Sequence, residues 1–119
     1  MLRTILKSKI HQATITQAEL RYEGSITVDS VILEAAGICV HEKVEVLNLN
    51  NGQRIETYAI SGEKNSGVIC LNGPAARFAC IGDEVIILCY GILEDKDAEL
   101  LKAKIVYLSK DNKIEKIKQ

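Results

Sequence analysis

The chain has 119 residues, a formal net charge of −1 and a hydrophobic fraction of 47%, with aromatic residues making up only 4%. This length suits one domain with a core of mainly aliphatic side chains, and it is too short for two domains. The near-neutral charge excludes the strongly basic surface that nucleic-acid binding usually needs, and a single Pro argues against a disordered or linker-rich protein.

The N-terminal segment, MLRTILKSKIHQ, mixes basic and apolar residues. A secretory signal would need an unbroken apolar region there, so we expect none. The longest apolar run, Val85–Tyr90, is far shorter than the ~20 residues that cross a bilayer, which predicts no membrane span. Cys39, Cys70, Cys80 and Cys89 form no C-x-x-C pair and have no His at ligand spacing. We therefore predict reduced thiols in a cytoplasmic protein, with no metal site.

Short runs with strand propensity, bounded by Gly and Asn, dominate the chain. The clearest hairpin is centred on Asn51-Gly52, a pair that predicts a tight turn with positive φ angles. The eight predicted strands are Thr4–Ile10, Ala13–Thr16, Ser25–Val28, Val44–Leu49, Arg54–Ile60, Gly67–Leu71, Glu84–Tyr90 and Lys104–Leu108.

Three short helices are predicted between the strands, over Val31–Ala36, Pro74–Ala79 and Glu94–Leu101. Asp29 or Ser30 can cap the first helix, and Gly37 ends it. Pro suits the first turn of the second helix, and the third is acidic at its start. The last ten residues, KDNKIEKIKQ, are predicted to be a loosely held tail, with contact to a partner as the alternative. The sequence therefore predicts a small, closed, mainly β barrel with short helices at its corners.

Four separated segments carry a resemblance to a known family: KSKIHQATIT, YEGSITVD, NNGQRIETYAI and GVICLNGPAARFACIGDEVIIL. Together they resemble the aspartate 1-decarboxylase family, pyruvoyl-dependent enzymes that make β-alanine for pantothenate and coenzyme A synthesis. The resemblance runs in register from Leu2 to Tyr90 and continues more weakly to Asn112. It implies a double-psi β-barrel that assembles as a homotetramer with active sites between subunits.

The resemblance also implies that the single Gly-Ser bond, Gly24-Ser25, cleaves itself. Ser25 would attack the Gly24 carbonyl, and elimination and hydrolysis would convert Ser25 into the pyruvoyl cofactor. Thr57 would assist this cleavage by a hydrogen bond to the developing oxyanion. The products would be residues 1–24 (the β chain) and 25–119 (the α chain), held together as one domain. A β-hydroxyl can both attack and later be eliminated, and Gly offers an unhindered carbonyl, so the residue types suit the chemistry.

The implied substrate is L-aspartate, which would form a Schiff base with the ketone at position 25. This ketone would accept the electrons released as CO2 leaves, the role that pyridoxal phosphate performs elsewhere. Tyr58 would return the proton. Lys9 and Arg54 would meet the anionic substrate. We hypothesise that they hold the retained side-chain carboxylate, because a cation on the departing carboxylate would stabilise the ground state.

The resemblance adds Thr57, Asn72, Gly73, Pro74 and Ala75 as substrate contacts. Family members usually have Ala at the position of Pro74, and Pro has no N–H to donate there, whereas the Ala75 N–H remains available. Tyr22 and His11 are candidate pocket residues, and each could equally be a core side chain. His41 matches no motif and is predicted to be a solvated loop residue.

An alternative from another class is a non-catalytic β-barrel module that never cleaves and serves binding or assembly, because fold alone does not fix function. The joint presence of Lys9, Gly24, Ser25, Arg54, Thr57, Tyr58 and Asn72 favours the enzyme. Some members of the resembled family need a maturation factor and others cleave unaided, and the sequence leaves both open. Neither nucleic acid nor membrane is an expected partner.

Overall fold

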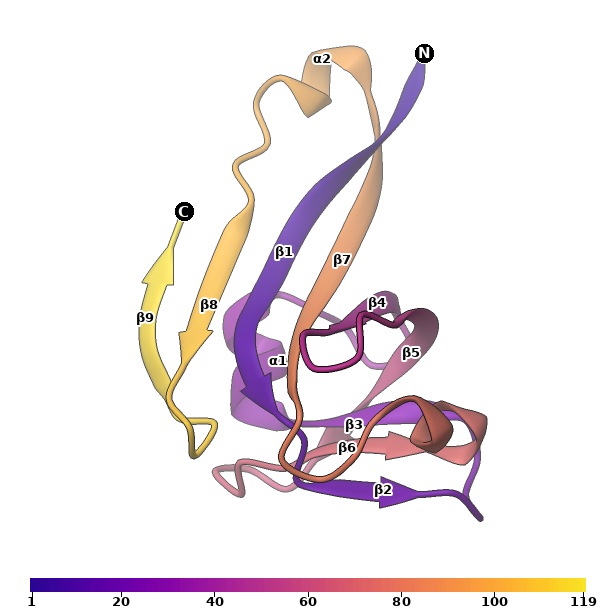
Figure 1. The fold of residues 1–119 in the computed structure, drawn as a ribbon. Coiled ribbons are helices and arrows are strands. Elements are labelled where there is room, and N and C mark those ends of the chain that lie inside the picture. The colour runs from indigo at the N-terminus through magenta and orange to yellow at the C-terminus, as the bar shows by residue number, and fades with distance from the viewer.

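The structure, a computed structural model, describes residues 1–119 and is built mainly from β-strands (Figure 1). The strands are β1 (Leu2–Thr14), β2 (Gln17–Glu19), β3 (Ser25–Asp29), β4 (Lys43–Asn48), β5 (Arg54–Gly62), β6 (Ile69–Asn72), β7 (Glu84–Glu94), β8 (Lys104–Leu108) and β9 (Ile114–Lys118). The helices are α1 (Ser30–Ala36), the 3-10 helix η1 (Gly73–Phe78) and α2 (Asp95–Ala98).

The strands close into a barrel because β1 and β2 are two parts of one bent segment. The hydrogen-bonded strands follow one another in the order β2-β6-β3-β5-β4-β7-β1, and β8 and β9 continue the sheet beyond β1. Between β1 and β2, Ile15 N donates to Asp83 O, just before β7, and Thr16 N donates to Ile69 O in β6. The segment thus joins both ends of the strand order, which confirms the prediction of a small barrel with short helices.

The barrel interior is aliphatic, as the composition predicts. A cluster of 20 buried residues fills it, formed by Ile, Val, Leu and Ala with one cysteine, Cys89. Fully burying each Ile, Leu or Val side chain contributes about 1.5–3 kcal/mol. Successive side chains of a strand point to opposite faces, so alternate residues, such as Ile26 and Val28 of β3, supply the core. The other residues of each strand lie on the outer face.

Helix α1 begins and ends as predicted. The Asp29 side chain accepts a hydrogen bond from Val31 N, and Gly37 ends the helix in the left-handed region at φ 68°. The second predicted helix is the 3-10 helix η1, which has Pro74 in its first turn. The third prediction, Glu94–Leu101, is too long: α2 spans Asp95–Ala98 and buries no side chain. Without an apolar face to pack, only about one turn is held.

Two predictions for the strands are wrong in part. The predicted strands Thr4–Ile10 and Ala13–Thr16 belong to one long strand, β1. Its pairing with β7 shifts register between Ile10 and Ala13, where Gln12 has φ 62°, and then continues, so this irregularity does not end the strand. The predicted hairpin is confirmed, because β4 and β5 pair in antiparallel fashion, but its turn has positive φ only at Gly52. The Asn48 side chain accepts from the N–H groups of Asn50 and Asn51 and holds a longer loop than the predicted tight turn.

The prediction of a loose C-terminal tail is also wrong. Residues Ile114–Lys118 form β9, which pairs with β8 and covers its otherwise open edge. Asn112, 2% exposed, anchors this hairpin, since its Nδ2 donates to Thr14 O at 2.9 Å and to Gly67 O at 2.7 Å. The C-terminus is thus tied to both β1 and the loop before β6.

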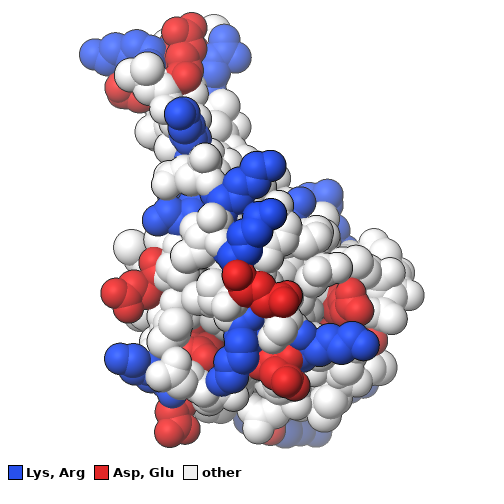
Figure 2. Space-filling view, turned by 90° about the vertical axis from the view of Figure 1, so that its left-hand side faces the viewer, with Lys and Arg blue, Asp and Glu red and all other residues white.

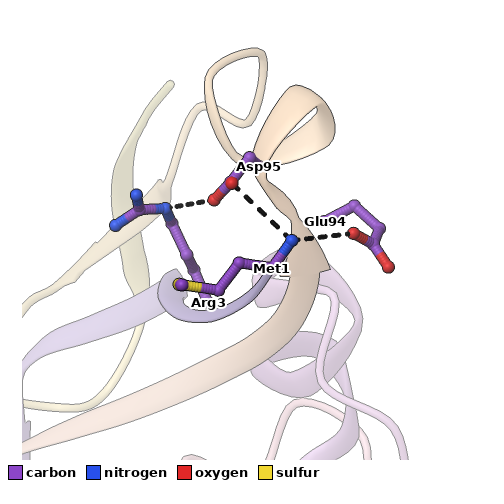
Figure 3. Close-up of polar contacts among 4 residues, drawn as sticks. All are labelled: Met1, Arg3, Glu94 and Asp95. Atoms are coloured by element: carbon purple, nitrogen blue, oxygen red, sulfur yellow. Dashed lines mark hydrogen bonds and ion pairs between the residues drawn. The ribbon is translucent and has the colours of Figure 1, made fainter.

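The outer parts of β1 and β7 rise above the barrel as a long arm that carries α2 and the N-terminus (Figure 1). At its tip the Met1 ammonium lies 3.4 Å from Glu94 Oε2 and 3.7 Å from Asp95 Oδ2, and Arg3 Nε donates to Asp95 (Figure 3). On the β8–β9 side of the molecule, Lys and Arg side chains run along the middle of the face, and Asp and Glu side chains lie at the tip of the arm and over the lower half (Figure 2). No helix is long and apolar enough to cross a membrane.

Candidate active site

The Gly24-Ser25 bond lies where a surface loop enters the barrel. Ser25 is the first residue of β3 and pairs with Asn72, the last residue of β6. Ser25 is 1% exposed and Asn72 is 3% exposed, whereas Tyr22 and Glu23, just before the bond, are exposed. The bond therefore joins a solvated loop to a dry strand end, and water is excluded on the serine side.

Asn72 holds the Ser25 hydroxyl. Its Nδ2 donates to Ser25 Oγ at 2.9 Å and to Thr27 Oγ1 at 2.8 Å. One lone pair of Ser25 Oγ is thus occupied, and the hydroxyl itself lies 3.4 Å from Glu23 O. Because the contact is buried, water cannot replace the amide as a donor, and the side chain of Ser25 is kept in one orientation.

Gly73 and Pro74 lie against the backbone that leads into the bond. Gly73 has φ 66°, and a Cβ added there would lie 2.8 Å from Tyr22 O and 2.9 Å from both N and Cα of Gly24. A Cβ added at Gly24 would meet Pro74 Cδ at 3.7 Å. Only a glycine lets the two backbones approach so closely, so the turn at Gly73 and the segment Tyr22–Gly24 are mutually fixed.

We name Gly24, Ser25, Asn72, Gly73 and Pro74 the cleavage cluster. The sequence predicted all five as site residues, and the structure brings them together in one chain. Ala75 lies next to the cluster and packs against the core.

Tyr58 lies on the strand beside Ser25. β3 and β5 are parallel with Ile26 opposite Ala59, so the preceding residues, Ser25 and Tyr58, are neighbours on the same face. Thr57 pairs with Val44, a core residue, and Tyr58 pairs with Lys43. The two side chains thus point to opposite faces, and Tyr58 is the one on the side of Ser25.

The structure adds His41 to this neighbourhood. Its ring packs edge-on against that of Tyr58 with 5.9 Å between centroids. Its backbone N–H donates to Ala59 O at 2.7 Å. The predicted loop position and exposure are confirmed. The sequence did not predict its contact with Tyr58, because the contact depends on strand register and leaves no signal in the residues around His41.

Lys9 and Arg54 lie elsewhere, on a surface that we name the charged face: the outer side of β1, β7, β4 and β5, carrying Lys9, Glu45 and Arg54. Lys9 pairs with Leu88, and Leu88 pairs with Glu45. Arg54 Nη1 donates to Glu45 Oε1 at 2.6 Å, and the Arg54 side chain is 57% exposed. This single contact leaves the other guanidinium donors of Arg54 available to an anion.

The charged face does not reach Ser25 within one chain. Arg54 is four positions before Tyr58 on β5, about 13 Å at ~3.3 Å per residue. Lys9 lies in the part of β1 that pairs with β7 and β8, whereas the segment after β1 continues into β2 beside β6, the neighbour of β3. His11 stays on β1 as well, where its ring packs edge-on against Tyr107 with 5.4 Å between centroids.

The family model and the curated relatives that match the sequence agree with each other. Residues 1–115 match the family model described as aspartate decarboxylase. The aspartate 1-decarboxylase of Carboxydothermus hydrogenoformans is 52% identical over 119 residues, which cover 100% of this chain and 94% of that protein. That of Listeria monocytogenes is 56% identical over 117 residues, covering 98% and 92%. Among solved structures, the crystal structure of the rationally designed mkDPBB_sym_86 protein aligns with a TM-score of 0.49 and 15% identity, over 65% of this chain and 90% of that chain.

Proposed function

The chain belongs to the aspartate decarboxylase family, and on that premise we propose that it converts L-aspartate into β-alanine and CO2 for pantothenate and coenzyme A synthesis. Family membership favours this enzyme over a non-catalytic barrel module. The observation that carries the proposal is the buried Ser25 hydroxyl, which Asn72 Nδ2 holds at 2.9 Å. The backbone of Gly24 just before the bond is close enough to Gly73 that no side chain fits there.

The first reaction in the proposal is self-cleavage between Gly24 and Ser25. Ser25 Oγ attacks the Gly24 carbonyl carbon, the C–N bond breaks, and the hydroxyl proton passes to the nitrogen, which gives an ester with a free Ser25 amine. Loss of the Cα proton of residue 25 then breaks the Cβ–Oγ bond, which releases the Gly24 carboxylate and leaves dehydroalanine. Water replaces the nitrogen, which departs as ammonia, and residue 25 becomes a pyruvoyl group.

The surroundings of residue 25 fit a pyruvoyl group. The group is no larger than serine, and its carbonyl oxygens accept hydrogen bonds but donate none. Asn72 Nδ2 is a buried donor aimed at this residue, and Thr27 Oγ1, the other partner of Nδ2, lies on the same face. When present, the group supplies an electron sink for the electron pair released as CO2 departs.

The remaining residues bind the substrate and move a proton. Arg54 and Lys9 hold the retained side-chain carboxylate, because a cation fixed on the departing carboxylate would oppose its loss. The free guanidinium donors of Arg54 offer two parallel hydrogen bonds to that carboxylate. Tyr58, beside residue 25, donates a proton to the carbon that loses CO2.

The proposal includes a homotetramer with active sites between subunits. The separation of the charged face from the cleavage cluster along β5 supports this arrangement, because a second chain would bring its own Arg54 and Lys9 to residue 25. After cleavage, residues 1–24 stay in place through the pairing of β1 with β7 and β8 and of β2 with β6. A cytoplasmic location belongs to the proposal too, and cleavage proceeds either unaided or with a maturation factor, as in different members of the family.

The test combines intact-mass spectrometry with an assay for β-alanine. After warming, wild-type protein is expected to give residues 1–24 and a fragment 25–119 that is lighter by one ammonia than its serine-terminated form. This preparation should release β-alanine from aspartate, whereas Ser25→Ala should stay full-length and inactive. A fully cleaved, pyruvoyl-bearing protein that does not convert aspartate would contradict the proposed substrate.

A further inference from the structure

Asn72 has a third hydrogen-bond partner that the proposed function does not use. Cys70 lies two residues earlier on β6, on the same face of the strand, and is 3% exposed. Its Sγ is 3.3 Å from Asn72 Oδ1 and 3.8 Å from Leu71 O, so the single thiol proton has its nearer acceptor in the carbonyl end of the Asn72 amide. The Nδ2 end of the same amide donates to Ser25 and Thr27. Every polar end of this buried amide is thereby paired.

The thiol decides which end of the amide faces Ser25. The hydroxyls of Ser25 and Thr27 can donate as well as accept, so by themselves they would tolerate the amide in either orientation. A thiol is a weak donor and sulfur is a weak acceptor. With the amide turned over, its N–H groups would face sulfur in a place where no water can serve as acceptor, which is costly. The observed orientation is therefore the favoured one.

The orientation matters for the attack on Gly24. An N–H that points at Ser25 Oγ fixes the oxygen and stabilises the negative charge that builds on it as its proton leaves. A carbonyl oxygen in that place would repel the same charge. We propose, on the basis of the proposed function, that Cys70 is a positioning residue of the self-cleavage, which acts by holding the Asn72 amide with Nδ2 toward Ser25.

The state of the thiol agrees with a donor role. Burial raises the pKa of Cys70 above its ordinary value of 9.0, and the nearby Glu19 carboxylate raises it further, so the sulfur keeps its proton at neutral pH. Cys89 is also buried, at 0% exposure, but it pairs with Ser8 of β1 and donates to Lys43 O, away from the cleavage cluster. The chain thus contains its own matched control.

The experiment follows self-cleavage of freshly purified precursor by intact mass in Cys70→Ser, Cys70→Ala, Cys70→Val and Cys89→Ala. Ser keeps a donor, whereas Ala and Val remove it, and Val also fills the space that Ala leaves empty. We expect Cys70→Ser to cleave within about twofold of wild type, and the Ala and Val variants to be slower by about three- to tenfold, the loss of one hydrogen bond. Cys89→Ala should cleave at the wild-type rate. Thermal unfolding of each variant identifies any that fail to fold.

A double-mutant cycle tests whether Cys70 acts through Asn72. In an Asn72→Ala background, Cys70→Ala should slow cleavage no further. The inference is overturned if both Cys70→Ala and Cys70→Val cleave at the wild-type rate, or if Cys70→Ser is as slow as they are. It is also overturned if Cys70→Ala still slows cleavage in the Asn72→Ala background. Wild-type cleavage in the same experiment reports separately on the proposed function, which fails if wild type never cleaves, either alone or in an extract that supplies a maturation factor.

Discussion

The cleavage cluster and the charged face are built in opposite ways. Around Ser25 the polar groups are buried and paired, and Gly73 holds the backbone of Gly24 by direct contact. On the charged face Arg54 is half exposed and has one partner, Glu45. The first region is complete in one chain, and the second is open to solvent.

This difference matches two different tasks. Self-cleavage is a reaction between two adjacent residues of the same chain, so a rigid, dry site in that chain is sufficient. Binding of aspartate needs charged groups that stay accessible until substrate arrives. Changes in the cleavage cluster should therefore affect cleavage and turnover together, whereas changes on the charged face should affect turnover alone.

The largest effect is expected for Gly73→Ala. The new Cβ would meet Tyr22 O at 2.8 Å and Gly24 N at 2.9 Å, which displaces the scissile bond. Displacement of a reacting group by about 1 Å can cost ~100-fold in rate, so cleavage should slow by about that factor. Time-resolved intact-mass spectrometry measures it. Gly37→Ala is the control, because Gly37 has φ 68° and nothing within 4 Å; equal slowing in both variants would contradict the contact argument.

Arg54→Lys should separate the two regions. Lysine keeps the charge but cannot form two parallel hydrogen bonds to a carboxylate, so kcat/KM for aspartate should fall by about 10- to 100-fold. Cleavage should stay within about twofold of wild type, because Arg54 is far from Ser25 in its own chain. Arg3→Lys, at the tip of the arm (Figure 3), should change neither kcat/KM for aspartate nor the rate of cleavage. Unchanged turnover in Arg54→Lys would remove Arg54 from the substrate site.

Glu42→Gln tests stability at a site outside both regions. Lys7 Nζ donates to Glu42 Oε2 at 2.6 Å. Burial is the largest single influence and acts against both charges. For Glu42 the hydrogen bonds from Lys7 and from Cys39 N, together with the charge of Lys7, outweigh burial and hold the pKa below its ordinary 4.5. For Lys7 the hydrogen bond to Glu42 and the smaller charge contributions together outweigh burial and hold the pKa above 10.5. The pair therefore stabilises the fold between about pH 4.5 and 10.5, and this contribution is lost as pH falls through the lowered pKa of Glu42.

The expected loss in Glu42→Gln at neutral pH is about 1 kcal/mol, or a fall in Tm of about 4 °C, with cleavage unchanged. The difference from wild type should shrink below pH 4. Glu56→Gln, which removes the exposed pair with Lys43, is the control and should leave Tm almost unaltered. Measurements at one protein concentration keep any effect of assembly constant. A difference in Tm that persists at low pH would contradict the ionic origin.

Much of the barrel and the cleavage cluster could be predicted because their signals are local. Alternating aliphatic residues mark the strands, and Asp29 and Gly37 mark the ends of α1. Gly24, Ser25 and Asn72 stand in motifs that resemble a family, and their pairing follows from the antiparallel register of β3 and β6.

The rest depended on contacts between residues far apart in sequence. Asn112 meets Thr14 and Gly67 across most of the chain, so the composition of the tail alone suggested a loose segment. His41 meets Tyr58 only through the register of β4 and β5. The role of Cys70 required the orientation of an amide, which no residue pattern records.

Mixed assembly of two inactive variants tests most directly whether the substrate site is completed by a second chain. Ser25→Ala chains keep Arg54 but cannot form the pyruvoyl group, and Arg54→Ala chains cleave but lack the clamp. Co-expressed and purified as mixed oligomers, identified by native mass spectrometry, they should regain about a quarter of wild-type turnover, as expected for random pairing at a two-chain site. Mixed oligomers that remain inactive would place Arg54 in the same chain's site and contradict this account.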